Sequence, residues 1–312
     1  MIEKNDLSLR ILGLQRSGNH AVIRWLISQF PDKNTIFLNN VKHGDYNPIL
    51  TCDLLEINSI KTTVEESNIK QLRKKLLVYS YEDETKKMAN ANFISSVFNP
   101  DFEKNKNKYI GDSCHEFNVV IIRDPFNFFS SRLKKLHQLT GSSCINTIKS
   151  NWLNVAELAL GDIKLKHVNN PIIIINYNEW FNNKDYRRYI SKKLNGKFSD
   201  QSLAQVTKEG GGSSFNGTEY TQMTFKLFWA KKAQLLHSQT YKNITKNFKK
   251  LFAQGGQNMK VLERWHTMVN DEIYRDIFSE TELIKSSERI SKEIAGTRSF
   301  VESCQKTHEK NL

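Results

Sequence analysis

Short apolar runs rich in β-branched residues alternate with longer segments of helical periodicity over most of this chain. The apolar runs predict strands at residues 8–14, 35–38, 76–81, 118–123 and 171–176. The helical patterns cover residues 19–29, 84–98, 125–139, 145–160 and 179–194. The last two predicted strands each hold four consecutive aliphatic residues, which is typical of strands buried on both faces. Strands that alternate with helices predict an α/β fold with a doubly wound, mainly parallel sheet flanked by helices.

The first predicted strand leads directly into a glycine loop, which reads G-L-Q-R-S-G-N-H over residues 13–20. Because a helix follows, backbone N–H groups and the helix dipole would hold an anion there. Loops for nucleoside triphosphates with the same G-x-x-x-x-G spacing continue with Lys and Ser or Thr, which bind phosphate and magnesium. Here Asn19 and His20 stand at those places, and Arg16 lies inside the loop. The loop therefore predicts an anionic nucleotide that is bound without a metal ion.

A second candidate anion site follows the predicted strand at 118–123. Arg123 ends that strand, and Pro125 suits the first turn of a helix because its missing N–H would be unpaired there. Ser131 lies about two helical turns further on. In a parallel sheet Arg123 would point to the same edge as the glycine loop. An arginine can grip a phosphate with two hydrogen bonds, and a serine hydroxyl can donate another.

Arg16-Ser17-Gly18 and Arg123 with Ser131 together resemble the 3′-phosphoadenosine-5′-phosphosulfate (PAPS)-dependent sulfotransferases. That family pairs an Arg/Lys-Ser-Gly loop for the 5′-phosphosulfate with a strand-end Arg and a Ser eight residues later for the 3′-phosphate. The resemblance implies a P-loop NTPase-like fold and transfer of a sulfuryl group from PAPS to a hydroxyl or amine acceptor. The expected acceptor is a glycan or small molecule, the product is adenosine 3′,5′-bisphosphate, and no metal is implied.

The resemblance also implies individual roles for residues along the chain. Arg16, Ser17, Gly18, Asn19 and His20 would hold the 5′-phosphosulfate. Tyr177, after the last predicted strand, would lie near the adenine. Arg123, Ser131 and a late loop would hold the 3′-phosphate, with the loop residues being Gly212, Ser213 and Ser214. Arg264-Trp265 is a weaker echo of the family. Two departures stand out: Asn19-His20 replaces the Thr-Thr of many members, and the late loop lacks their Arg-Lys-Gly.

Sulfuryl transfer needs a base for the acceptor and positive charge at the bridging oxygen of the leaving phosphate. Arg16 is the expected source of that charge, and His20 could donate to the same oxygens. The family's base is commonly a His or Glu just beyond a strand that flanks the nucleotide. Glu82, directly after the predicted strand at 76–81, is therefore the first candidate base, Asp83 the second, and His20 or His43 the third. A carboxylate base needs burial to raise its pKa toward neutrality.

Charge, cysteine content and the distribution of apolar residues predict the kind of partner and the cellular compartment of the protein. The chain has 312 residues, with 46 Lys and Arg against 33 Asp and Glu, a net charge of +13 that implies acidic partners. Its four cysteines form no C-x-x-C pair, its first residues are polar, and no apolar run is long enough to span a membrane. These features predict a cytoplasmic protein with reduced thiols and no membrane span. Since no linker divides the chain, we expect one domain over 1–312, with a basic helical excursion at about 220–260.

Two other functions remain open from the sequence. A nucleotide or small-molecule kinase with an unusual loop would require magnesium-dependent ATP binding. A non-enzymatic binder of nucleic acid or acidic glycans would require a contiguous basic face with interleaved aromatic residues, a mixture found at residues 225–250. The same mixture suits a helix pair packed on the core, and without a long basic arm nucleic acid is not expected as a partner. The identity of the acceptor and the oligomeric state stay undetermined.

Overall fold

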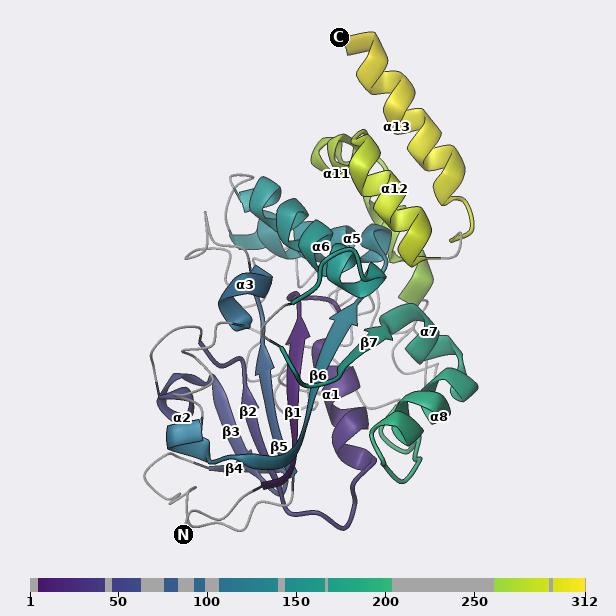
Figure 1. Ribbon diagram of the computed structural model, residues 1–312. Helices are drawn as coiled ribbons and strands as arrows, with labels where there is room; N and C mark the ends of the chain where they lie inside the picture. Colours follow the sequence, from purple (N-terminus) through teal and green to yellow (C-terminus); the bar gives the residue numbers. More distant parts are fainter. Residues whose placement is uncertain are drawn as a thin grey trace, which may run out of the picture.

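The structure is a computed structural model in which the described residues are 5–42, 47–62, 76–83, 93–98, 107–139, 144–165, 168–203, 261–291 and 294–311. A twisted sheet lies in the middle of the molecule, and helices lie on both of its faces (Figure 1). The predicted segments 220–260 and 212–214, together with His43, lie outside the described residues. All four cysteines are described, and each is a free thiol. None of the described helices is long and apolar enough to cross a membrane.

The sheet has seven strands in the spatial order β4-β3-β2-β5-β1-β6-β7. Their bounds are β1 Asn5–Gly13, β2 Thr35–Asn39, β3 Leu54–Ile57, β4 Ile60–Thr62, β5 Leu76–Tyr81, β6 Ser113–Ile122 and β7 Ile172–Asn176. The five strands from β2 to β7 in this order run parallel, while β3 and β4 add an antiparallel hairpin at one edge. This confirms the expected fold class, a mainly parallel α/β sheet.

Helices cover both faces because the strands alternate their apolar side chains between two cores. Leu9 and Ile11 of β1 pack into a cluster with α1, α7 and α8, whereas Leu12 joins the cluster of α3, α5 and α6 on the other face. The helices are α1 Asn19–Ser28, α2 Pro48–Thr51, α3 Phe93–Val97, α5 Pro125–Leu139, α6 Ile145–Leu160, α7 Tyr177–Asn182, α8 Lys184–Lys193, the 3-10 helix η3 Val261–Met268, α11 Glu272–Ile277, α12 Thr281–Ile290 and α13 Thr297–Asn311. The last three helices lie beyond α5 and α6 (Figure 1).

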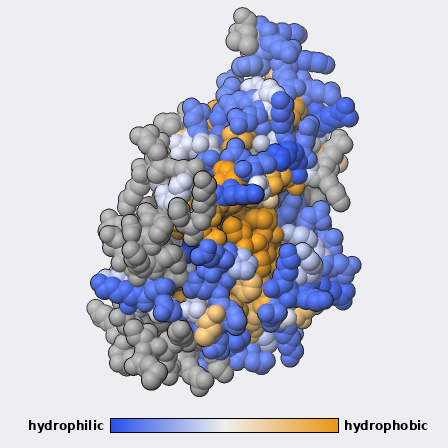
Figure 2. Space-filling model, viewed as in Figure 1, coloured by the Kyte–Doolittle hydropathy of each residue, from blue (hydrophilic) through white to orange (hydrophobic). Residues whose placement is uncertain are grey.

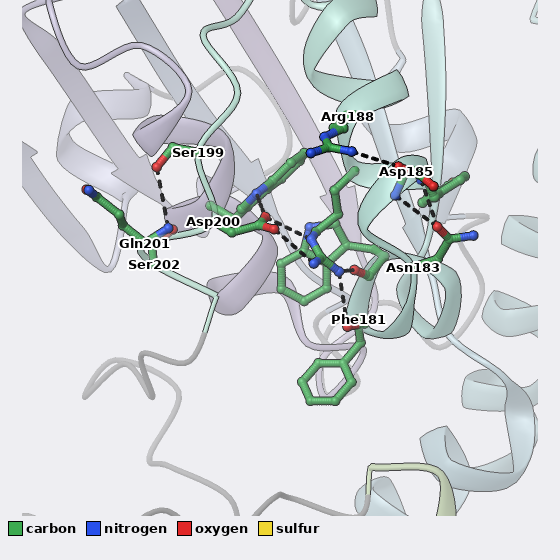
Figure 3. Close-up of polar contacts among 12 residues, drawn as sticks. Phe181, Asn183, Asp185, Arg188, Ser199, Asp200, Gln201 and Ser202 are labelled. Atoms are coloured by element: carbon green, nitrogen blue, oxygen red, sulfur yellow. Dashed lines mark hydrogen bonds and ion pairs between the residues drawn. The ribbon is translucent and has the colours of Figure 1, made fainter.

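The helix expected at 179–194 is in fact two helices, α7 and α8, that meet at Asn183. The Asn183 side chain accepts hydrogen bonds from the backbone N–H groups of Asp185 and Tyr186, at 3.0 and 3.1 Å (Figure 3). An Asn that caps the following helix in this way interrupts the apolar periodicity only at one residue, which explains why the pattern reads as continuous. Of the helix expected at 84–98, the described part is α3.

The prediction for β7 is wrong in one respect, because this strand is not buried on both faces. Ile172 and Ile174 are half-buried, whereas Ile173 and Ile175 are buried. The cause is position, since β7 is an edge strand and β6, with a similar aliphatic run, has neighbours on both sides. Apolar surface lies at the centre of the visible face, in the region of β6 and β7 (Figure 2). The hairpin β3–β4 and helices α11–α13 were not among the expected elements.

Candidate anion-binding site at the carboxyl edge of the sheet

The glycine loop lies at the point where the order of the parallel strands reverses. β1 lies between β5 and β6, and the chain crosses over β1 when it passes from β5 to β6. Three adjacent strand ends therefore deliver their following residues to one edge: the glycine loop after β1, Glu82 and Asp83 after β5, and Arg123 after β6. Such a reversal opens a crevice at the carboxyl ends of the strands, where ligands of open α/β sheets bind.

The two glycines of the loop are required by close contacts. A Cβ atom on Gly13 would lie 2.0 Å from Oδ1 of Asn19, and one on Gly18 would lie 2.1 Å from Cε2 of Tyr177. Gly18 also has a φ of +91°, which side-chain-bearing residues rarely adopt. The G-x-x-x-x-G spacing thus reflects two places where the loop must pass directly against another side chain.

The loop places its charged residue in an unusual backbone conformation. Arg16 has a φ of 76°, in the left-handed region that a non-glycine residue adopts at a cost of about 1–3 kcal/mol. Ser17 is buried, and its N–H donates to the carbonyl of Leu14 at 3.0 Å. Asn19 begins α1 and donates from Nδ2 to the carbonyls of Gly13 and Leu14, both at 3.1 Å. The loop is therefore held in a fixed shape before any ligand binds.

Arg123 is the cation that the second motif predicts, and the structure brings it to the glycine loop. The side chain is 2% exposed, and its NH1 donates to the carbonyl of Arg16 at 3.2 Å. Its guanidinium carbon lies 5.1 Å from the centre of the Tyr177 ring, within range of a cation–π interaction. The backbone carbonyl of Arg123 accepts a hydrogen bond from Trp152 Nε1 at 3.1 Å. Arg123 is therefore held both at its guanidinium group and at its backbone.

A third arginine, Arg264 on η3, joins Arg16 and Arg123. Burial and the positive charges of Arg123 and Arg16 lower the pKa of Arg264 to about 10, although Tyr177 and Asp124 act in the opposite direction. The backbone of Arg264 is held by α5, where Ser130 Oγ donates to its carbonyl at 3.2 Å. The positive charges around Arg264 favour the binding of a multiply charged anion at this place.

α5 carries Ser131, the other described residue that the sequence predicts for the second anion. Ser131 is 2% exposed, one residue beyond the serine that holds Arg264. Asp124 caps the helix by accepting from the N–H of Asn127 at 2.8 Å, and the amide of Asn127 accepts in turn from the N–H of Trp265 at 3.2 Å. These hydrogen bonds hold η3, more than 130 residues further along the chain, against the helix that begins after Arg123.

Tyr177 lies against the loop as a buried side chain. It is 5% exposed, begins α7 directly after β7, and packs its ring against Gly18 and the head of Arg123. Its ring also stacks on Phe181, with ring centres 6.2 Å apart. These contacts support the shape of the loop; the contact with an adenine that the resemblance implies stays a prediction. His20, the second residue of α1, is half-buried.

The two carboxylates after β5 have different surroundings. Glu82 is half-buried; its Oε1 accepts from Asn19 Nδ2 at 2.8 Å, and its N–H donates to Asn40 Oδ1 at 3.2 Å. Burial raises the pKa of Glu82, although the hydrogen bond from Asn19 and the charge of Arg132 lower it. Asp83 is fully buried, and burial raises its pKa to about 6 against the opposing effect of Arg132. Both retain the raised pKa that a base requires, but Glu82 alone is accessible.

The arrangement supplies the groups for binding an anion and for accepting a proton at one edge. Arg16, Arg123 and Arg264 provide positive charge, α1 points its N-terminus at the loop, and Glu82 lies beside Asn19 of the loop. Among the described residues, no three His, Cys, Asp or Glu side chains are arranged to hold a metal ion.

Comparisons with known proteins found similar solved structures but no match by sequence. No protein-family model matches it, and no curated protein matches its sequence. It is similar to the crystal structure of mouse sulfotransferase SULT7A1 complexed with PAP, at 12% identity and a TM-score of 0.39 over 88% of this chain and 90% of that one. It is also similar to the sulfotransferase domain of the Synechococcus PCC 7002 olefin synthase, at 10% identity and a TM-score of 0.44 over 93% and 96% of the two chains. Identities and TM-scores this low establish no function, so a functional inference depends on the residues of the site.

Two residues of the site were assigned no role from the sequence. Arg264 lies in a segment that shows only a faint likeness to the family, and Arg132 follows Ser131 in an ordinary helical pattern. A signal for Arg132 did exist, since it is a charged residue on the apolar side of α5, where it is 3% exposed. A charge at such a position requires a buried partner.

Proposed function

We propose that this protein is a PAPS-dependent sulfotransferase. The observation that supports it most is the meeting of Arg16, Arg123 and Arg264 beside a glycine loop and a helix N-terminus. A ligand with two separate anionic groups fits this set better than a single phosphate. The 5′-phosphosulfate of PAPS would lie on Arg16, Ser17, Gly18, Asn19 and His20, and the 3′-phosphate on Arg123, Ser131 and Arg264.

In the proposed reaction Glu82 acts as the base. It takes the proton of an acceptor hydroxyl or amine, whose oxygen or nitrogen then attacks sulfur. The bond from sulfur to the bridging oxygen breaks, and adenosine 3′,5′-bisphosphate leaves with the electron pair on a phosphate oxygen. Arg16 stabilises the negative charge that develops there, which is the contribution expected of a fixed cation in a site shielded from water. A glycan or small molecule is proposed as the acceptor.

A thermal-shift titration tests the proposal. Because a ligand that binds only the folded state raises its melting temperature, adenosine 3′,5′-bisphosphate without metal should raise Tm in a concentration-dependent way. ATP with magnesium should have a smaller effect. A larger shift with ATP and magnesium would instead support a kinase, and no shift with either ligand would count against both. Release of adenosine 3′,5′-bisphosphate from PAPS, screened over hydroxyl- and amine-bearing acceptors, then tests catalysis.

A further inference from the structure

Asp83 and Arg132 form a buried ion pair that closes around one residue of the glycine loop. Arg132 NH2 lies 2.7 Å from Asp83 Oδ2, with the two side chains 4% and 0% exposed. Gln15 lies between them: its N–H donates to Asp83 Oδ1 at 2.7 Å, and its Oε1 and carbonyl oxygen accept from Arg132 NH1 at 2.8 and 3.3 Å. The peptide groups on both sides of Gln15 are therefore held by charged partners.

Gln15 is the residue directly before Arg16, whose φ of 76° is rare for a side-chain-bearing residue. Such a conformation persists only where the surrounding structure holds it. The carbonyl of Arg16 then accepts from Arg123, so one short segment is fixed by Asp83 and Arg132 on one side and by Arg123 on the other. Any shift of Gln15 would move the Arg16 side chain relative to the Arg123 head.

A buried ion pair is weak evidence for stability, because removing two charges from water costs about as much as their attraction returns. The pair instead fixes the positions of three elements, because it connects the residues after β1 and β5 to α5, which carries Ser131. Both oxygens of Asp83 are occupied by these contacts, and the residue is fully buried. Asp83 is therefore not placed to take a proton from an acceptor, unlike its neighbour Glu82.

We propose that Asp83 and Arg132 are positioning residues, which clamp Gln15 and so hold Arg16 in place for the anionic nucleotide. The proposal rests on the proposed function for the identity of that nucleotide. It divides two adjacent carboxylates by role: Asp83 fixes the loop, and Glu82 faces the acceptor. Arg132, which follows Ser131 of the second motif, thereby positions the glycine loop at residues 13–20.

The test compares Asp83→Asn, Arg132→Lys and the double variant with the wild-type protein. Asn at position 83 still accepts from the Gln15 N–H but loses the charge, and Lys at 132 keeps the charge but loses the planar fork. We expect each to weaken binding of adenosine 3′,5′-bisphosphate by about tenfold to a hundredfold, as a misplaced binding group does. The double variant should lose little more than either single one, because the residues act as a unit. Calorimetry measures all four affinities.

A second readout separates positioning from loss of overall stability. Hydrogen exchange should accelerate in the peptide that covers residues 13–20 and stay unchanged in α8 and α12. The matched control is the exposed pair Asp162–Arg289, at 2.7 Å, whose variants Asp162→Asn and Arg289→Lys should leave affinity and exchange unchanged.

The outcomes are distinct. If the wild-type protein does not bind the nucleotide, the proposed function fails; if it binds and Asp83→Asn and Arg132→Lys bind equally well, the positioning role fails. If Asp83→Asn does not fold, Arg132→Lys alone decides. Uniformly faster exchange over the whole sheet would overturn the proposal by assigning the pair to stability.

Discussion

Arg123 donates a hydrogen bond of 3.2 Å to the backbone carbonyl of Arg16, although 107 residues separate them. The bond joins the end of β6 to the glycine loop after β1, its neighbour in the sheet. Two cations that belong to separate sequence motifs thus lie in one site. A ligand with anionic groups at two places can pair with both, and PAPS has this property, on which the proposed function depends.

Arg123→Ala should weaken binding of adenosine 3′,5′-bisphosphate by about 1.5–3 kcal/mol, the range for a hydrogen bond to a charged group. The guanidinium is buried and held in place, so its removal leaves a phosphate without a prepared partner. Calorimetry gives the affinity, and Arg188→Ala, an exposed arginine on α8, is the control. Unchanged affinity in Arg123→Ala would remove the second anion site from the proposal.

Glu82→Gln should abolish most sulfuryl transfer and leave nucleotide affinity within about twofold, because an amide keeps the shape but cannot accept the proton. A base works when ionised, and burial raises the pKa of Glu82, so wild-type turnover should fall on acidification at a pH above the ordinary carboxyl range. The measurements are release of adenosine 3′,5′-bisphosphate from PAPS as a function of pH, and calorimetry. Turnover retained in Glu82→Gln would move the base elsewhere.

Gly18→Ala should destabilise the fold by about 2–4 kcal/mol, from backbone strain at positive φ together with overlap with Tyr177. Gly161→Ala is a matched control, because Gly161 has a φ of +79° but no atom within 4 Å of an added Cβ. Backbone strain alone should therefore destabilise that variant. Urea unfolding gives both values. Equal losses in the two variants would show that the contact between Gly18 and Tyr177 is not tight.

Asp83 should make folding stability fall as pH rises from about 4 to about 6. Its pKa is raised from 3.8 to about 6 in the folded protein, so in this interval the folded state binds more protons than the unfolded state and loses stability on deprotonation. The full effect of such a shift is about 3 kcal/mol. Urea unfolding at several pH values measures it, and Asp83→Asn should flatten the slope. A wild-type slope that persists in Asp83→Asn would assign the effect to other carboxylates.

Much of the local structure followed from the sequence. The limits of α5 and α6, as well as of β5, agree with the predicted residues, because amphipathic period, Pro125 at the first helical position and flanking polar residues act over short distances. The glycine spacing of the loop also indicated close packing, since neither Gly13 nor Gly18 has room for a side chain. The break at Asn183 was missed because a capping residue leaves the apolar period intact on both sides.

What periodicity leaves open is which elements become neighbours. β6 and β7 have similar aliphatic runs, yet only the position of β7 at the edge half-exposes Ile172 and Ile174. Glu82 and Asp83 are consecutive acids, and only the packing of α5 and its Arg132 against the end of β5 buries one of them completely. Burial and pairing depend on contacts between segments far apart in the chain. The sequence therefore determined the strand, loop and helix that could hold an anion, while the tertiary structure decided which charges surround it.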